Sequence, residues 1–486
     1  MVERIPISII FQGEPFDQSA VIHTLRHLAM RAGWTLRPDS PHRIIYATFE
    51  NPQWVEANPE AVVILSSPDV GRHLQNSTQP IPLTFRGKNH LPFLHPLAES
   101  VPTPNWIPAD VIAGAFAVLN LWYEGRTRPR HKDGWLRSAE DWWTRSGFSD
   151  PQPVADEWLD HIWEAASGAG WASRQKSPPG FSHISNTLLL THDVDYLPSP
   201  QNRGLPRVLR ALLRQTFLRH RPQDACSLLK NYLRAFRRKA PYTDFFHICS
   251  QEGRRGGRSS FQWVVARHHR YDPRYAAHAH DFVEGLRQLQ AWGGEICLHG
   301  SYTASRTPGR LTQERASLEH LLDVPVSGHR QHYLNFHPPD LFREVESAGF
   351  RYDLSIGYND RSGPRAGTRY PYRPYNLEHN RPHNFWEIPF FLMDTTLSTS
   401  YRFSSRQAWD HILHKLEGYS GCLAVIWHTE QFGGCLDPGF DDLYWQMLDC
   451  ARQKGIHLDN PGALLPDLEA AWEATVSDSF RELQHA

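Results

Sequence analysis

The sequence predicts an α/β protein in two parts, in which a smaller α/β domain precedes a barrel-like α/β domain. The chain has 486 residues, which is more than one hydrophobic core usually serves. Short β-branched runs alternate with amphipathic helical segments along most of its length. In the second part, polar residues come directly after apolar runs, and barrel-like α/β folds carry their chemistry just past strand ends.

The N-terminal part contains the elements of a small α/β domain, which we place at residues 1–130. Three β-branched runs are typical of strands, and they cover residues 5–11, 44–49 and 62–66. Residues 17–33 predict a helix, because apolar residues recur at helical spacing and Gly33 offers a C-cap. A strongly apolar helix is predicted over 110–124, with Asp110 at its start. The role of this domain stays open.

A helical, Trp-rich connector over residues 131–182 leads to the second part. It contains Trp135, Trp142 and Trp143, and a helix is predicted near 154–166. The turn-rich stretch at 177–183 indicates a boundary. We assign residues 183–465 to the barrel-like domain, with predicted strands at 187–191, 296–298 and 423–427.

The composition is typical of a globular protein, with 40% hydrophobic and 21% charged residues. A formal net charge of −1 gives the whole chain no attraction to nucleic acid. The N-terminus lacks the regions of a signal peptide, and no apolar run approaches a membrane span in length. The six cysteines form no CxxC pair, so neither a disulfide framework nor a zinc ribbon is predicted. The expected compartment is the cytoplasm.

Residues 203–239 form an unusually basic segment, with eleven Lys or Arg and one acidic residue, Asp224. One interpretation is a solvated pair of basic helices on the surface. The other is an amphipathic face that rests on anionic lipid or binds phosphate on a sugar donor. The second interpretation predicts a peripheral position at the inner membrane and contact with a lipid-linked substrate.

Residues 188–195 (LLLTHDVD) run from an apolar strand into two carboxylates. In extended backbone, residues two apart point to the same side, so Asp193 and Asp195 can converge on one metal ion or one water. A cation could neutralise one carboxylate and leave the other to act as a base. The alternative is a turn-initiating Asp pair with His192 packed nearby.

Three more stretches carry polar residues that suit a metal site, and in two of them these residues follow an apolar run. His299 follows the run 295–298, with small residues beside it. Arg330 and His332 are two residues apart, and an arginine can hold a carboxylate while a histidine beside it binds metal. His428 follows the predicted strand over 423–427.

One Asp and two His make a ligand set that zinc or another first-row metal accepts with an open coordination position. A remaining Asp and a remaining His then supply a base and an acid. Water activated by the metal attacks a carbonyl, and the acid protonates the departing amine. The ligand types alone do not distinguish zinc from cobalt, nickel or iron.

These four elements, in this order, resemble the polysaccharide deacetylase superfamily of metal-dependent carbohydrate N-deacetylases, over about residues 185–430. The resemblance implies a distorted (β/α) barrel. It implies that Asp193 is the base and that Asp195 and His299 are metal ligands. It further implies that Arg330 orients the base and that His428 is the general acid.

Two departures from the family's motifs concern the metal. The family usually has another histidine four residues after the first, where this chain has Thr303. It usually has proline after the motif arginine, whereas here His332 appears. We therefore predict that Asp195, His299 and His332 bind the metal, which is expected to be zinc, with His332 replacing the missing ligand.

The runs at 350–355, 365–368 and 387–389 also resemble a bacterial branch of the superfamily. That branch tends to have an extra N-terminal α/β domain and to occur among surface-polysaccharide biosynthesis functions. Tyr302, Arg365 and Glu387 are predicted to bind the sugar, and surface pairing is the alternative for Arg365 and Glu387. The expected partner is an N-acetylated sugar or glycan, with no nucleic acid.

The leading prediction is removal of an N-acetyl group from an amino sugar in a bacterial surface polysaccharide or its precursor. Asp193 and Asp195 also form the DxD element with which many glycosyltransferases bind a metal and a nucleotide sugar, but this leaves three histidines without a role. A third hypothesis is a non-catalytic glycan-binding relative. It gains if His332 lies more than about 5 Å from His299 and Asp195, well outside metal-ligand distances.

Overall fold

The structure, a computed structural model, describes residues 4–12, 17–47, 60–76, 83–86, 89–92, 105–126, 141–148, 150–171, 184–195, 213, 245–273, 280–432, 437 and 439–485. Both predicted domain boundaries fall outside these residues, as do Trp135 and almost all of the basic segment 203–239. The lipid contact expected of that segment therefore stays a prediction.

The N-terminal part is built on a five-stranded parallel sheet in the order β2-β1-β3-β4-β7. Its strands are β1 (Ile5–Gln12), β2 (Trp34–Leu36), β3 (Arg43–Ala47), β4 (Ala61–Leu65) and β7 (Trp106–Ile107), and β5 (Leu83–Arg86) and β6 (Asn89–Pro92) form a separate hairpin. The helices are α1 (Gln18–Ala32), α3 (Pro68–Asn76), α4 (Val111–Leu119), α5 (Trp122–Arg126), α6 (Trp142–Arg145) and α7 (Val154–Gly168).

Helix α1 confirms the predicted helix over 17–33. The Asp17 side chain accepts the first free backbone N–H group, from Ala20 at 2.8 Å. Gly33 ends the helix at φ 70°, a left-handed conformation that glycine adopts without steric cost. The apolar face of α1 is buried against the sheet and α4, which is what its helical spacing of apolar residues predicts.

The single helix predicted over 110–124 is wrong, because the chain breaks between α4 and α5. Asn120 competes with the helical hydrogen bonds there, donating from its side chain to Phe116 O at 2.8 Å. Its Oδ1 accepts the backbone N–H of Tyr375, which lies more than 250 residues along the chain, at 2.7 Å. Leu121 follows in the left-handed region at φ 48°. A tertiary contact therefore divides a segment whose composition is helical throughout.

The second part is built on a curled parallel sheet in the order β15-β12-β11-β10-β9-β8-β17-β16, with β18 beside the first half of β8. Its strands are β8 (Asn186–Val194), β9 (Ser259–Trp263), β10 (Glu295–Gly300), β11 (Gly328–Gln331), β12 (Tyr352–Asp353), β15 (Trp386–Glu387), β16 (Phe390–Met393), β17 (Gly421–Ile426) and β18 (His457–Asp459). Only Ile388 and Pro389 separate β15 from β16, so the two ends of the sheet lie close together. The predicted fold class, a distorted (β/α) barrel preceded by a smaller α/β unit, is confirmed.

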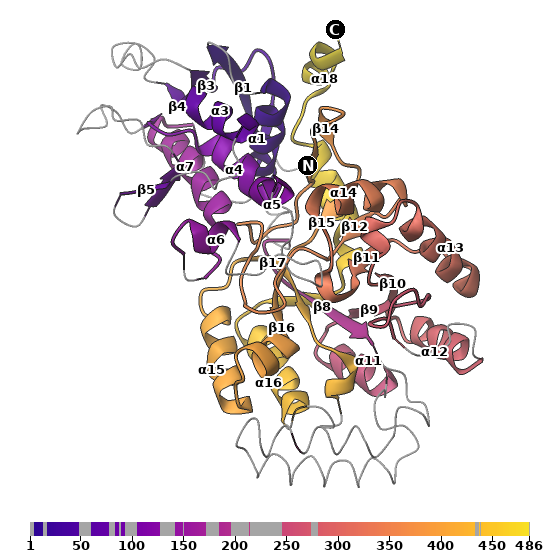
Figure 1. Cartoon of the computed structure of the whole chain (residues 1–486). Coiled ribbons are helices and arrows are strands. Elements are labelled where there is room, and N and C mark those ends of the chain that lie inside the picture. The colour runs from indigo at the N-terminus through magenta and orange to yellow at the C-terminus, as the bar shows by residue number, and fades with distance from the viewer. Residues whose placement is uncertain are drawn as a thin grey trace.

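Helices surround this sheet on its outer side (Figure 1). They are α11 (Phe245–Arg254), α12 (His280–Ala291), α13 (Arg310–Leu322), α14 (Pro338–Ser347), α15 (Ser405–Leu416) and α16 (Phe440–Gln453). Short turns of helix follow several strands, namely η3 (Ala304–Arg306), η4 (His332–Leu334), η5 (Thr396–Ser400), η6 (Thr429–Gln431) and η7 (Pro461–Leu464). The connection from β12 to β15 carries a small hairpin of β13 (Tyr375–Asn376) and β14 (Arg381–Pro382).

The last two helices, α17 (Leu465–Glu473) and α18 (Asp478–His485), return to the N-terminal part. Between them, Val476 forms a parallel bridge with Leu36 of β2. The guanidinium of Arg26 in α1 lies 3.9 Å from the ring centre of Trp472. The yellow C-terminal end accordingly lies at the same end of the molecule as the indigo N-terminal strands (Figure 1).

The segment from β12 to β15 joins the two parts through buried polar contacts. Arg365 pairs with Glu124 of α5 through two hydrogen bonds of 2.5 and 3.2 Å. Thr368 donates to Asp156 of α7 at 2.7 Å. All four side chains are buried. Because a buried charge is costly to leave unpaired, these contacts hold the N-terminal part in place on the barrel.

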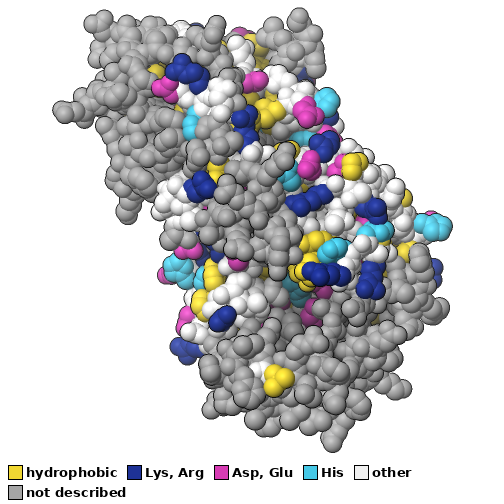
Figure 2. Space-filling view, viewed as in Figure 1, with side chains coloured by type: hydrophobic (Ala, Val, Ile, Leu, Met, Phe, Trp, Pro, Cys, Tyr) yellow, Lys and Arg dark blue, Asp and Glu magenta, His cyan; other side chains and the backbone are white. Residues whose placement is uncertain are grey.

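The described surface carries both signs of charge without a single dominant patch on the face shown in Figure 2, in agreement with a net charge near zero. Among the described helices, none combines the length and the apolar character needed to cross a membrane.

Candidate metal and catalytic site

The carboxyl ends of four strands bring the predicted site residues together. Asp193 lies in β8 and Asp195 directly after it, while His299 lies near the end of β10. His299 is the register neighbour of Arg330 in β11. His428 follows β17, which is paired with β8. Because neighbouring parallel strands end at the same edge of the sheet, residues far apart in sequence meet there.

Asp195, His299 and His332 form one compact group. Asp195 Oδ1 lies 3.7 Å from His299 Nε2 and 3.4 Å from His332 Nε2. One donor atom from each residue lies within 4.8 Å of the other two. His332 therefore lies within the 5 Å limit that would otherwise have favoured a non-catalytic relative.

The donor atoms of this group fit a cation. The Nδ1–H of His299 donates to Arg330 O at 3.0 Å, which leaves Nε2 as the free lone pair. Asp195 Oδ1 and His332 Nε2 are buried and have no hydrogen-bond partner among the described residues. Buried polar atoms without partners are rare, and two imidazole nitrogens with a carboxylate oxygen are ligands that zinc accepts. The identity of the metal stays a prediction.

Charge within the group follows from burial and mutual contact. Burial lowers the pKa of His299 to about 4, so this imidazole is neutral, as a ligand must be. Burial also opposes protonation of His332, but Asp195 and Asp272 raise the pKa of that imidazole to about 9. The pKa of Asp195 is lowered, because His332 first, and then His428 and His299, outweigh the effect of burial. The carboxylates of Asp195 and Asp272 thus attract positive charge to this position, either a proton on His332 or a cation.

Asp193 is held as a carboxylate by Arg330. The guanidinium Nη1 lies 2.5 Å from Asp193 Oδ1, while Nη2 donates to Thr191 Oγ1 at 2.8 Å and Nε to Leu354 O at 3.1 Å. Burial alone would raise the pKa of Asp193, but Arg330 and then His299 lower it. Arg330 is fully buried, so its orientation is fixed. Asp193 is therefore an ionised hydrogen-bond acceptor beside the Asp195 group.

His428 is paired with a carboxylate that the sequence analysis did not find. Its Nδ1 lies 2.7 Å from Asp394 Oδ1, and its Nε2 lies 3.9 Å from Asp195 Oδ2. Burial lowers the pKa of His428, yet Asp394 and the site carboxylates raise it well above the ordinary value. Asp394 follows the apolar strand Phe390–Met393, which is the same pattern of strand and polar residue that identified the other site residues.

His192, the neighbour of Asp193, points away from the site into a closed polar network. Its Nδ1 donates to Trp427 O at 2.7 Å and its Nε2 lies 2.8 Å from Glu252 Oε1. Tyr444 donates to the same Glu252 oxygen at 2.5 Å. All these side chains are buried, so His192 links the ends of β8 and β17 behind the site.

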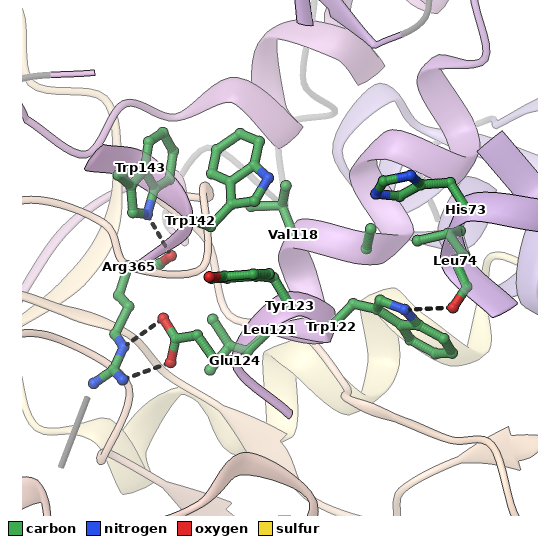
Figure 3. A pocket seen from close by; sticks show the side chains of 11 residues that line it. His73, Leu74, Val118, Leu121, Trp122, Tyr123, Glu124, Trp142, Trp143 and Arg365 are labelled. Carbon is green, nitrogen blue, oxygen red and sulfur yellow. Dashed lines mark hydrogen bonds and ion pairs between the residues drawn. The ribbon is translucent and has the colours of Figure 1, made fainter. Parts of the chain in front are cut away.

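The three residues predicted to bind the sugar have partners inside the protein. Tyr302 is buried and stacks on His269 with ring centres 4.5 Å apart. Arg365 and its partner Glu124 lie at one side of a pocket of about 20 Å³ between the two parts (Figure 3). Glu387 is fully buried and accepts the backbone N–H of Ile356 at 3.1 Å.

The alternative of surface pairing for Arg365 and Glu387 is wrong, because both are paired in the interior. Burial and then Asp353 raise the pKa of Glu387 well above its ordinary value, which favours its neutral form. Contact of Tyr302, Arg365 and Glu387 with a sugar stays a prediction.

No family model matches the chain, and no curated protein matches it. Solved structures do match. A Mycobacterium smegmatis protein assigned as a polysaccharide deacetylase is 14% identical over 59% of this chain and 91% of its own, with a TM-score of 0.37. A Parabacteroides distasonis protein assigned as a glycoside hydrolase/deacetylase is 10% identical over 60% and 73%, with a TM-score of 0.37. A CE4-family pseudoenzyme from Bacillus anthracis is 9% identical over 58% and 66%, with a TM-score of 0.31.

These matches name the family that the sequence motifs resemble. Identities of 14% and below, with TM-scores of 0.37 and below, carry no argument about activity or substrate.

Proposed function

We propose that this chain is a metal-dependent hydrolase that removes the N-acetyl group from an amino sugar in a bacterial surface glycan or its precursor. One observation carries the proposal: Asp195, His299 and His332 present free donor atoms within 4.8 Å of one another. Beside them lie a carboxylate fixed by Arg330 and an imidazole with a raised pKa. These are the parts that hydrolysis of an amide requires.

The roles of the residues follow from their partners. Asp193, ionised through Arg330, accepts the proton of the attacking water as its oxygen adds to the amide carbonyl. His428, protonated through Asp394, donates its proton to the nitrogen as the carbon–nitrogen bond breaks, which releases the amine and acetate. A divalent metal, with zinc as the expected ion, would be held by Asp195, His299 and His332 and would supply Lewis acidity at this place.

The glycosyltransferase hypothesis receives no support from this geometry. It requires both carboxylates of the DxD element for a metal and a nucleotide diphosphate. Asp193 is instead bound to Arg330 at 2.5 Å, and Asp195 groups with two imidazoles. The non-catalytic hypothesis is weakened, because His332 Nε2 lies 3.4 Å from Asp195 Oδ1 and within 4.8 Å of the His299 donor atom.

The test is acetate release from N-acetylglucosamine oligomers by the purified full chain, with metal content measured by mass spectrometry. We expect about one equivalent of divalent metal and a loss of at least ~100-fold in kcat for Asp193→Asn, because a general base contributes about 10²–10⁴-fold. Asp410→Asn is the matched control, since its side chain is 59% exposed on α15 and lies in no part of the site. A protein without metal whose turnover is unaffected by Asp193→Asn would refute the proposal.

A further inference from the structure

Asp272, which no motif singled out, is fixed by three backbone N–H groups. It lies in the segment that follows β9 and is 2% exposed. Its Oδ2 accepts the N–H groups of His268 at 2.8 Å and His269 at 2.7 Å. Its Oδ1 accepts the N–H of Tyr302 at 2.7 Å. Three such bonds hold the carboxylate in one orientation. His332 and then these backbone N–H groups lower the pKa of Asp272 against the effect of burial.

The fixed carboxylate faces the ring of His332. Asp272 Oδ1 lies 3.6 Å from His332 Nδ1, and Asp195 Oδ1 lies 3.4 Å from Nε2 on the other side of the same ring. Neither nitrogen has a hydrogen-bond partner within the described part of the chain, although the side chain is only 3% exposed. A proton on Nδ1 directed at Asp272 leaves the Nε2 lone pair for a cation beside Asp195.

The local backbone explains why a side chain, and not a backbone carbonyl, faces Nδ1 of His332. His299 still belongs to β10, and the carbonyl of its strand neighbour Arg330 holds its Nδ1–H. His332 has already left β11, and the next two residues, Tyr333 and Leu334, have φ of 58° and 51°. No ladder carbonyl of β10 pairs with His332. A carboxylate from the neighbouring loop occupies the equivalent position.

We propose that Asp272 is the positioning residue that fixes the ring of His332 and thereby makes it the second imidazole ligand. The inference rests on the proposed function, because it deepens the account of the same metal site. A carboxylate on the far nitrogen of a ligand imidazole sets its orientation and raises its basicity, and loss of such a partner typically costs 10–100-fold in metal affinity. Asp272 also binds Tyr302, the neighbour of Thr303, so it connects the loop that lacks the usual ligand to the residue that replaces it.

The competing interpretation is that Asp272 only holds its loop through the backbone N–H groups. A double-mutant cycle on zinc affinity separates the two, with affinity measured by competition against a chromophoric chelator. We expect Asp272→Asn to weaken zinc binding 10–100-fold in the otherwise natural chain and to have no further effect in a His332→Ala background. Equal losses in both backgrounds would show a role in the loop alone and would overturn the inference.

Glu314→Gln is the matched control, because Glu314 is a buried carboxylate that accepts the N–H of Ser301 in the same loop at 2.9 Å. Its carboxylate lies 3.6 Å from His268 and makes no hydrogen bond or ion pair with a proposed ligand imidazole among the described residues. We expect the zinc affinity of the Glu314→Gln variant to equal that of the natural chain within twofold. A loss as large as that of Asp272→Asn would also overturn the inference.

A second measurement needs no substitution and covers the case in which Asp272→Asn fails to fold. Nitrogen-15 spectra of histidine in the zinc-loaded natural chain report which nitrogen of His332 binds the metal. We expect Nε2 to bind and Nδ1 to carry a hydrogen-bonded proton, and ligation through Nδ1 would refute the inference. If the natural chain binds no zinc or other divalent metal, the proposed function itself is refuted. If it binds metal with an affinity that does not depend on Asp272, only the inference about Asp272 is refuted.

Discussion

At the scale of single residues, two buried pairs of charges set the protonation states of Asp193 and His428, the proposed catalytic side chains. Arg330 keeps Asp193 ionised, and Asp394 keeps His428 protonated, although burial acts against both charges. The two pairs therefore separate the protonation states of Asp193 and His428, the proposed base and the proposed acid.

Replacing Asp394 should alter the pH dependence of turnover. His428 has a raised pKa, so it keeps its proton until the pH rises through that value. Asp394→Asn removes the charge that raises this pKa most, and His428 then loses its proton at lower pH. We expect the alkaline limb of the kcat/KM profile to move to lower pH and kcat to fall about 10-fold or more. Identical alkaline limbs for the variant and the natural chain would contradict the assignment of His428 as the acid.

The sequence allowed most of the candidate site residues to be predicted, but not the residues that hold them in place through hydrogen bonds and ion pairs. Asp193, Asp195, His299 and His428 each follow a predicted strand, and Arg330 was singled out by its spacing to His332. All five meet in the structure. Asp394 follows a strand in the same way, and closer attention to this pattern would have found it. Asp272 lies in a loop, where no periodicity marks a residue, so only the tertiary structure reveals its position.

At the scale of elements, the parallel register of β8, β10, β11 and β17 positions the site. The predicted strands at 187–191, 296–298 and 423–427 are confirmed as parts of β8, β10 and β17. They could be predicted because a strand that is buried on both faces has a continuous apolar run. The two-residue strands β12 and β15 were not predicted, since a segment that short shows no periodicity. His332 illustrates the same limit, because it lies in a turn of η4 and not in the extended backbone assumed for it.

Gly300, the residue after His299, is required by close packing in β10. A Cβ at this position would lie 2.6 Å from His329 Nε2 and 2.9 Å from Leu311 Cδ2. We expect Gly300→Ala to destabilise the fold by about 1–3 kcal/mol, the usual cost of overpacking, and to reduce zinc affinity by displacing His299. Urea denaturation and chelator competition measure the two effects.

Gly285→Ala is the control for that substitution, because a Cβ there meets nothing within 4 Å and lies in helix α12. Alanine should leave stability unchanged or raise it by up to about 1 kcal/mol, given its higher helix propensity. If the two alanine variants unfold at the same urea concentration, close packing is not the reason why position 300 is a glycine.

At the scale of the whole molecule, the two sheets share one continuous hydrophobic core. The C-terminal helices pack on α1, and the segment from β12 to β15 places its charged residues against α5 and α7. The barrel and the N-terminal part are therefore expected to unfold together.

The buried pair of Arg365 and Glu124 should contribute to this coupling. Removal of one partner leaves an uncompensated buried charge, so we expect Glu124→Gln and Arg365→Met each to destabilise the chain by about 3–5 kcal/mol, and the double variant by less than their sum. Urea denaturation of the full chain measures these values. Unchanged stability together with a raised KM for Arg365→Met would instead support the predicted contact of Arg365 with a sugar.

The sequence by itself determined the α/β class and the apolar strands with their polar ends, because these depend on local periodicity and on residue type. The identity of the residues alone also led to the prediction that His332 replaces the ligand missing at Thr303. The tertiary structure decided what surrounds these groups. Hydrogen-bond partners such as Asp272 for His332 and Asp394 for His428, and the break at Asn120, depend on contacts between segments that are distant along the chain. Such contacts leave no periodic signal, so they become visible only when the chain is folded.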